Sequence, residues 1–165
     1  MHRRPYILYI VGIAFFCAMD TMMKKLVGTM PAVSATWWRY LLATLFTLPF
    51  WVRAGLPRPT REMLPLHMLR AAFVSVSAVS FFWGIGRLPL AQAVTIGFSA
   101  PLMIPPLAAL ILKERLESRS IGAGALGFCG VLVASGIGSA QPHDIAGVAA
   151  VALSAATYAV TVVIM

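Results

Sequence analysis

Charged residues are scarce in this chain, and acidic residues are the scarcest. Only 11% of the 165 residues are Asp, Glu, Lys or Arg, and only five are acidic. Hydrophobic residues make up 60%, and the mean hydropathy is +0.87. A soluble domain is closer to half apolar and a quarter charged. The composition therefore excludes an ordinary water-soluble fold and predicts a membrane protein.

The chain also lacks the residue patterns of an enzyme or a metal site. It contains no HExxH, G-x-S-x-G or P-loop sequence, no cysteine cluster and no acidic pair. The histidines at positions 2, 67 and 143 are far apart in the sequence, and Cys17 and Cys129 fall inside apolar runs, as small packing residues do. We therefore expect no enzymatic activity, no cofactor and no metal ion.

Long apolar runs are what the sequence has in abundance. A helix needs about 20 mostly apolar residues to span the hydrocarbon core of a bilayer. Six runs meet this requirement, at 6–27, 32–52, 65–87, 89–112, 120–139 and 145–165. The strands of a membrane barrel are about ten residues long, which is half the length of these runs. The expected fold is an all-α integral membrane protein with six transmembrane helices.

The basic residues indicate how these helices are oriented. They are strung between the apolar runs rather than gathered on one face, so the net charge of +8 does not predict a nucleic-acid partner. If the six runs alternate in direction, nine basic residues lie on the N-terminal side and four on the other. The nine are Arg3, Arg4, Arg53, Arg58, Arg61, Arg70, Lys113, Arg115 and Arg119, and the four are Lys24, Lys25, Arg39 and Arg87. Segments rich in Lys and Arg stay in the cytoplasm, which places the N-terminus there.

Asp20 stands in the stretch "FFCAMDTMMKK", after a run that is otherwise apolar. It lies seven residues before Val27, and Arg39 lies seven residues after the start of the next run, so both are about 10 Å from the same boundary. A lone charge in hydrocarbon costs on the order of 3 kcal/mol. We therefore expect Asp20 to pair with Arg39, helped by Lys24 at i+4. Two roles remain open for this pair: an inert clasp between the first two helices, or a gating or substrate contact.

The run at 89–112 contains three prolines in "AVTIGFSAPLMIPPLAAL". Pro101, Pro105 and Pro106 have no backbone N–H, so the carbonyls four residues earlier lose their partners. Irregular backbone is tolerated at membrane depth where protein or a watery cavity receives the freed groups, and such helices often form substrate sites in transporters. The alternative is a kink that only shapes the bundle.

Polar side chains accompany these prolines. Gln92, Thr95 and Ser99 follow one another at i, i+3 and i+7, which predicts one polar face facing a cavity or a neighbouring helix. Trp83, near the end of the preceding run, can stack on a substrate or anchor the helix at the membrane interface.

The run at 120–139 is rich in small residues. Gly130, Ala134 and Gly138 are four residues apart, and Ala123 and Gly127 form a second such pair. Small residues at this spacing allow helices to approach closely. We therefore expect this helix to pack tightly against another through this face, either a helix of this chain or one of a second chain in a dimer.

Longer stretches of the sequence resemble a known family. "WWRYLLATLFTLPF", followed by "GRLPLAQAVTIGFSAPLMIPPLAALILKERLESRSIGAGALGFCGVLVA", is similar to the EamA-type transporters of the drug/metabolite transporter superfamily. The likeness covers Ile7 to about Gly138. It implies a fold of ten helices in two inverted five-helix repeats, with a path for small metabolites lined by the helices at 6–27, 65–87 and 89–112. This chain departs from that pattern because it has only six of the ten helices.

The sequence also hints at a repeat. "GIA" at 12–14 resembles "GVA" at 147–149, an offset of 135 residues that corresponds to five helices. Because five is odd, a second copy enters the membrane from the opposite face, as in inverted-repeat transporters. We expect residues 1–140 to form a first repeat and 141–165 to begin a second, truncated one.

The expected function is an inner-membrane permease that moves a small metabolite or drug by alternating access. Its expected partners are the lipid bilayer, a small-molecule substrate, and a second repeat or an identical chain. The candidate residues of the substrate path are Asp20, Arg39, Trp83, Gln92, Thr95, Ser99 and Pro101. The alternatives are a half-size transporter that needs a partner chain, and a structural or assembly protein of the membrane.

Overall fold

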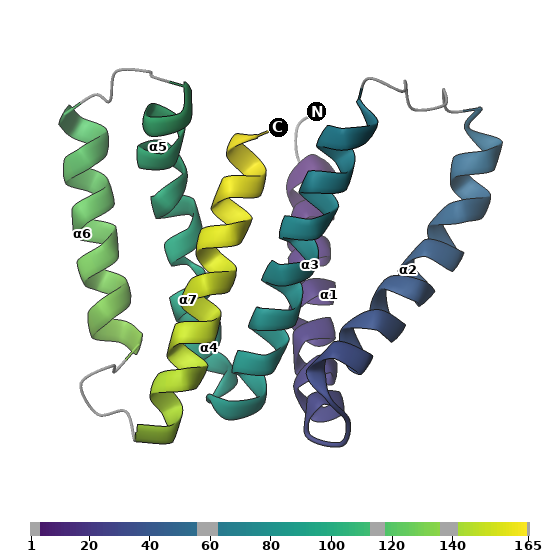
Figure 1. Ribbon diagram of the computed structural model, residues 1–165, viewed down its shortest axis with the longest axis horizontal. Coiled ribbons are helices and arrows are strands. Elements are labelled where there is room, and N and C mark those ends of the chain that lie inside the picture. The colour runs from purple at the N-terminus through teal and green to yellow at the C-terminus, as the bar shows by residue number, and fades with distance from the viewer. Residues whose placement is uncertain (1–3, 56–62, 113–117, 136–141, 165) are drawn as a thin grey trace.

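The protein is an up-and-down bundle of helices (Figure 1). The computed structural model describes residues 4–55, 63–112, 118–135 and 142–164, and within these ranges it contains seven helices and no strand. They are α1 (Arg4–Val27), α2 (Ala32–Arg53), α3 (Leu64–Arg87), α4 (Leu90–Gly97), α5 (Ser99–Leu112), α6 (Ser118–Ser135) and α7 (Pro142–Val163). Because α4 and α5 follow each other within one apolar run, the six predicted helical segments are all present.

The predicted boundaries agree with the structure to within three residues wherever the structure describes them. Two helices begin directly after a proline, α2 after Pro31 and α4 after Pro89. The fixed φ of proline suits this position, and its missing N–H costs nothing before the first turn. Residues 136–139, the predicted end of the fifth segment, lie outside the described residues.

Among the described residues, four helical segments are long and apolar enough to cross a membrane: Tyr6–Val27, Leu64–Arg87, Leu90–Ile111 and Ile145–Val163. Helix α2 is as long as these but contains Arg39, and the apolar part of α6 is shorter, at Ser120–Ala134. Successive segments run in opposite directions. The chain enters α1 at the end of the bundle where α7 finishes (Figure 1). The all-α membrane architecture predicted from the composition is confirmed.

The fourth segment is interrupted, as its prolines predict, but the break lies three residues before the first of them. Helix α4 ends at Gly97, and α5 begins at Ser99 after a single turn residue, Phe98. Pro101 is therefore the third residue of α5, where backbone N–H groups have no partner within the helix. Pro105 and Pro106 lie inside α5 and leave it unbroken. The prolines thus allow the break without marking its position.

The buried core lies toward one end of the bundle, where α1 ends and α2 begins. We call this the α1–α2 end. The core consists of Met23, Ala32, Ala35, Phe82, Ile85, Leu88, Ala93, Ile96 and Val151. Toward the opposite end, every described side chain is exposed at 6–18 of α1, 42–53 of α2 and 64–72 of α3. The first three helices are therefore packed together at the α1–α2 end, while no other described part of this chain covers the rest of them.

Helix α7 is the most centrally packed helix of the bundle. Its most extensive contact is with α3, and it also contacts α4 and α5 (Figure 1). Gly147, Val151, Ala155 and Ala159 follow one another at intervals of four residues and are all buried. A Cβ atom added to Gly84 of α3 would lie 2.5 Å from Cγ2 of Val151 and 3.0 Å from the carbonyl oxygen of Gly147. The two helices therefore approach closely because small residues line their contact, as is common in membranes.

The small residues of α6 are packed only in part against the described chain. A Cβ atom added to Gly127 would lie 2.8 Å from Cδ2 of Leu102 on α5, so this glycine is in a close contact. An added Cβ atom on Gly130 meets nothing within 4 Å, so the predicted face that begins at Gly130 is not packed against the described chain. Gly138 lies outside the described residues. Packing of the Gly130 face against a second chain stays a prediction.

Candidate functional site

Asp20 is buried inside the bundle without a partner for one of its oxygens. It lies on the inward face of α1, one turn before Met23, and is only 4% exposed. Its Oδ1 atom has no hydrogen-bond partner in the part of the chain that the structure describes. Burying an unpaired carboxylate costs several kcal/mol, so such a group is rare unless it has a function.

The nearest basic residue in the sequence does not neutralise it. Lys24 is one turn after Asp20 on the same helix, but its Nζ atom donates hydrogen bonds to the carbonyl oxygens of Ile85, at 2.9 Å, and Leu88. These carbonyls lie at the C-terminal end of α3, where the last carbonyls of a helix lack partners and carry a partial negative charge. Lys24 therefore ties α1 to α3 at the α1–α2 end.

The predicted ion pair between Asp20 and Arg39 is not formed in the described part of the chain. The Nε atom of Arg39 instead donates to the sulfur of Met19, 3.3 Å away. Its guanidinium carbon lies 5.1 Å from the ring centroid of Tyr40 and 5.2 Å from that of Phe82. Two aromatic rings and a thioether thus hold the cation that was expected to contact the carboxylate directly.

Trp83 lies on α3 with 37% of its surface exposed. The guanidinium carbon of Arg87, one turn later, lies 4.0 Å from the centroid of its ring. This is a close cation–π contact, so one face of the indole is already occupied by a residue of the same helix.

The polar residues of the fourth segment are divided between α4 and α5. Gln92 and Thr95 are half-buried on α4, whereas Ser99 is buried as the first residue of α5. The hydroxyl of Thr95 donates to the carbonyl of Ala91 at 2.8 Å, within its own helix. The single turn residue Phe98 separates Ser99 from Gln92 and Thr95. Pro101 is exposed in the first turn of α5.

A buried hydroxyl pair joins α3 and α7. The Oγ atom of Ser77 donates to the carbonyl oxygen of Ser154 at 2.9 Å and lies 3.1 Å from the Oγ atom of Ser154. Neither serine is among the site residues predicted from the sequence. A serine within a run of alanines, "ALSAAT", is the only sequence signal for Ser154.

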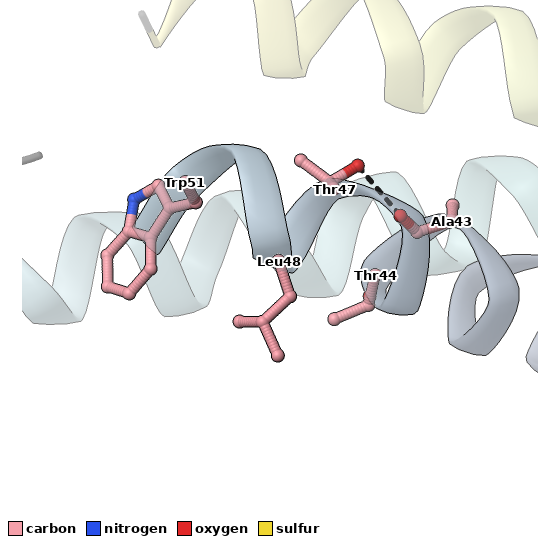
Figure 2. Close-up of a pocket in the computed structure, with 5 residues that line it drawn as sticks. All are labelled: Ala43, Thr44, Thr47, Leu48 and Trp51. Carbon is pink, nitrogen blue, oxygen red and sulfur yellow. Dashed lines mark hydrogen bonds between the residues drawn. The ribbon is translucent and has the colours of Figure 1, made fainter. Parts of the chain in front are cut away.

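The pocket in Figure 2 lies away from all these residues. It is lined by Ala43, Thr44, Thr47, Leu48 and Trp51, which all belong to α2. The hydroxyl of Thr47 donates to the carbonyl of Ala43 at 2.7 Å and is therefore satisfied within the helix (Figure 2). A hollow lined by a single helix does not enclose a ligand, so we do not place the candidate site there. No group of three or more His, Cys, Asp or Glu side chains in the described ranges could hold a metal ion.

The model of the EamA-like transporter family matches residues 4–136, which is most of the chain. The chain belongs to this family. The matched range begins with α1 and includes Asp20, Arg39, Trp83 and the broken fourth segment. The resemblance inferred from the sequence is confirmed. The prediction that the chain is a multi-pass membrane protein is confirmed as well.

Several transporters of the EamA-like family are similar to this chain in sequence. A riboflavin transporter of Rhizobium johnstonii is 31% identical over 103 residues, which cover 62% of this chain and 34% of that protein. A pseudopaline exporter of Pseudomonas aeruginosa is 27% identical over 61% of this chain and 35% of the exporter. An S-adenosylmethionine uptake transporter of Rickettsia bellii is 26% identical over 82% of this chain and 47% of the transporter.

These EamA-like relatives are transporters of small molecules, but the chain matches less than half of each of them. No solved structure matches the chain. The comparisons therefore establish the family and the kind of protein, and they do not identify a substrate.

Proposed function

We propose that this chain is part of a permease that moves a small metabolite or drug across a bacterial inner membrane by alternating access. The observation that carries the proposal is Asp20, a buried carboxylate with an unpartnered oxygen inside a spanning helix of a transporter-family protein. Ionisable residues at membrane depth commonly mark substrate or ion pathways. A buried, unpaired charge lowers the stability of a purely structural bundle, so its presence favours a functional role.

The proposed path runs past Asp20 and Arg39 toward the broken fourth segment with Gln92, Thr95, Ser99 and Pro101, with Trp83 near its outer end. Packing supports this placement. The bundle is closed by α1–α3 and α3–α7 contacts at the α1–α2 end, whereas the opposite halves of α1, α2 and α3 are uncovered. Alternating access needs a site that opens to one side at a time, and differing closure at the two ends is the geometry that it requires.

The missing wall of the path is proposed to be a second repeat. The aligned relatives extend well beyond the matched region, and α7 runs antiparallel to α1, as the first helix of an inverted repeat does (Figure 1). An identical or different partner chain is the competing arrangement. Crosslinking of the purified protein distinguishes the two, because a partner chain yields a covalent dimer and a second repeat does not.

The proposed orientation places the N-terminus in the cytoplasm, because the basic residues favour that side by nine to four. A phosphatase that is active only in the periplasm, fused after Met30, tests this orientation. Activity of the fusion supports the orientation, and activity of a cytoplasmic reporter at the same site contradicts it.

The decisive test of the proposed function is transport by the complete gene product in proteoliposomes. The relatives named for riboflavin, pseudopaline and S-adenosylmethionine supply the first compounds to be tested. We expect Asp20→Asn to reduce uptake at least about tenfold, because the charge at the path is lost. Thr21→Ala is the matched control, since Thr21 is exposed and its hydroxyl donates within α1 to Cys17. Normal transport by Asp20→Asn would show that Asp20 is not part of the substrate path. It would favour the alternative that this chain is a structural or assembly protein of the membrane.

We propose no enzymatic activity for the chain, since the family and its characterised relatives are transporters. Permeation requires only differing affinity and access in two states.

A further inference from the structure

The ends of α1 and α3 are joined by one charged side chain. The ammonium of Lys24 on α1 donates to the carbonyl oxygen of Ile85, at 2.9 Å, and to that of Leu88, which follows the last residue of α3. The residue four positions after Ile85 is Pro89, which has no backbone N–H, so the helix leaves this carbonyl without its usual donor. Lys24 therefore supplies a hydrogen bond that α3 cannot make itself.

Among the described residues, helix α1 is buried in the bundle only at its final turns. Its side chains at 6–18 are all exposed, whereas Asp20 and Met23 are buried. A Cβ atom added to Gly86 of α3 would lie 2.8 Å from Cγ1 of Val27, so the last turn of α1 rests on the end of α3. The contacts of α1 with α2 and α3 are limited. Because segments with few buried contacts open more readily than well-packed ones, α1 is the helix that can move.

The contact between α3 and α7 is of a different kind. It is the most extensive contact of the bundle, and it contains the buried hydrogen bond from Ser77 to the carbonyl oxygen of Ser154. Separating these two helices would leave buried polar groups unpaired at membrane depth, which is costly. Lys24 is only half-buried and lies three residues before the end of α1, so water can replace its carbonyl partners. The bonds of Lys24 can therefore break and form again while α3 and α7 stay together.

We infer that Lys24 is the latch of the closed end: it holds the last turn of α1 against the end of α3, and the two separate when the substrate path opens at the α1–α2 end. This inference rests on the proposed function and names the contact that regulates access to that path. Lys24 acts through the position of α1 and touches no substrate, so it is a positioning residue. Helices α3 and α7 remain in contact in both states.

A disulfide that can be formed and reduced tests whether the ends of α1 and α3 separate during transport. A Cβ atom placed on Gly86 would lie 3.8 Å from Cβ of Val27, which is the usual Cβ–Cβ distance in a disulfide. We expect the complete gene product with Val27→Cys and Gly86→Cys, and with its other cysteines replaced by alanine, to transport in the reduced form. Oxidation should lower transport at least about tenfold, and a reductant should restore it, because the latch cannot open. Transport by the oxidised protein at the reduced rate would overturn the inference.

A second disulfide controls for oxidation itself. A Cβ atom placed on Gly147 of α7 would lie 3.2 Å from Cβ of Arg87 on α3. Arg87→Cys with Gly147→Cys therefore joins the two helices that are expected to stay together. The oxidised and reduced forms of this pair should transport at the same rate, and mass spectrometry verifies each disulfide. Loss of transport on oxidation of both pairs would overturn the assignment of the moving contact to α1 and α3.

Variants of Lys24 test its part in closing this end. Ala35 of α2 is fully buried in the core at the α1–α2 end, and Ala159 of α7 is equally buried. Ala35→Cys and Ala159→Cys, each in the same cysteine-free protein, react with a water-soluble maleimide only when they become exposed. Lys24→Met should raise the labelling rate of Ala35→Cys at least about tenfold and leave that of Ala159→Cys unchanged, because both hydrogen bonds that favour the closed form are lost. Lys24→Arg keeps a cation with N–H donors and should restore most of the protection, and Lys25→Met should leave it unchanged.

The outcomes separate the latch from the proposed function. Equal increases in labelling at both reporters would mean that Lys24 only stabilises the fold, which refutes the latch. Unchanged labelling of Ala35→Cys in the Lys24→Met variant refutes it as well. Transport that continues in the oxidised Val27 and Gly86 pair refutes the latch and leaves the proposed function standing. Absence of transport by the unaltered protein for every compound tested would instead refute the proposed function, while protection of Ala35→Cys that depends on Lys24 would keep the latch as a conformational contact.

Discussion

The ammonium of Lys24 lies 2.9 Å from the carbonyl oxygen of Ile85 and donates a hydrogen bond to it across two helices. The same ammonium also donates to the carbonyl oxygen of Leu88, the residue that caps α3. A cation at the C-terminal end of a helix is favourable because it pairs with carbonyls that the helix cannot satisfy itself. Lys24 therefore closes the α1–α2 end of the bundle.

Replacing this lysine is expected to weaken the bundle. Lys24→Met keeps the aliphatic stem but removes both hydrogen bonds, so the free energy of unfolding should fall by about 1.5–3 kcal/mol, the usual range for hydrogen bonds to charged groups. Unfolding in detergent, followed by tryptophan fluorescence, measures the loss. Lys25→Met is the matched control, since Lys25 is exposed and should change stability by less than about 0.5 kcal/mol. Equal effects of the two variants would show that Lys24 is not a clamp.

The close approach of α3 and α7 gives a second prediction. A methyl group at Gly84 would overlap Cγ2 of Val151 and press on the backbone at Gly147. We expect Gly84→Ala to lower the free energy of unfolding by about 1–3 kcal/mol, the cost of overpacking a core. Combining it with Val151→Ala removes the side-chain overlap and should restore part of the loss.

The control for this prediction is another helical glycine. An added Cβ atom on Gly12 of α1 meets nothing within 4 Å. Gly12→Ala should therefore stabilise the protein by up to about 1 kcal/mol, because alanine is the better helix former. A destabilised Gly12→Ala together with an unaffected Gly84→Ala would contradict the packing described for α3 and α7.

The helices were predictable from the sequence because their signal is local. Run length and hydropathy identified all six segments, and three prolines in one run indicated a broken helix. Phe98 could not be identified as the breaking point. A proline is tolerated throughout the first turn of a helix, so Pro101 is compatible with several starting residues for α5.

The contacts of the candidate site were less predictable because they join distant parts of the chain. Asp20 could be singled out as an isolated acid, and its partner was expected from equal depth in the membrane. The depth of two residues in the membrane does not determine how each helix is rotated about its own axis. It also does not determine which acceptor a basic side chain binds. Lys24 is bound to a carbonyl 61 residues away, and backbone carbonyls leave no mark in the sequence. The side-chain partners of Arg39 likewise depend on how α2 turns toward α3.

The break in the fourth segment yields a third prediction. Pro101→Ala restores a backbone N–H that can donate to the carbonyl of Gly97, which allows α4 and α5 to join in one helix. Since Pro101 is in a first turn, the free energy of unfolding should change by less than about 1 kcal/mol. Transport by the complete gene product should fall if the irregular backbone contributes to the path.

Pro105 provides the comparison for Pro101. It is exposed within α5, where a proline costs about 3 kcal/mol relative to alanine in a regular helix. Pro105→Ala should therefore stabilise the protein more than Pro101→Ala does, while the break at Phe98 and transport persist. The reverse order of stabilities would show that the helix does not restart at Ser99.

Asp20 gives the last prediction, a conflict between stability and function. Asp20→Leu replaces a buried carboxylate that has an unpartnered oxygen with an apolar side chain of similar size. Replacing buried charges with well-packed apolar residues is often stabilising by about 1–4 kcal/mol, so the free energy of unfolding should rise by an amount in this range. Transport should be lost in the same variant, because the proposed partner of the substrate is gone. Unfolding in detergent and uptake into proteoliposomes, measured on one preparation, test both expectations. A less stable Asp20→Leu variant would mean that the carboxylate holds the helices together, and its loss of transport would then follow from damage to the fold rather than from a missing contact.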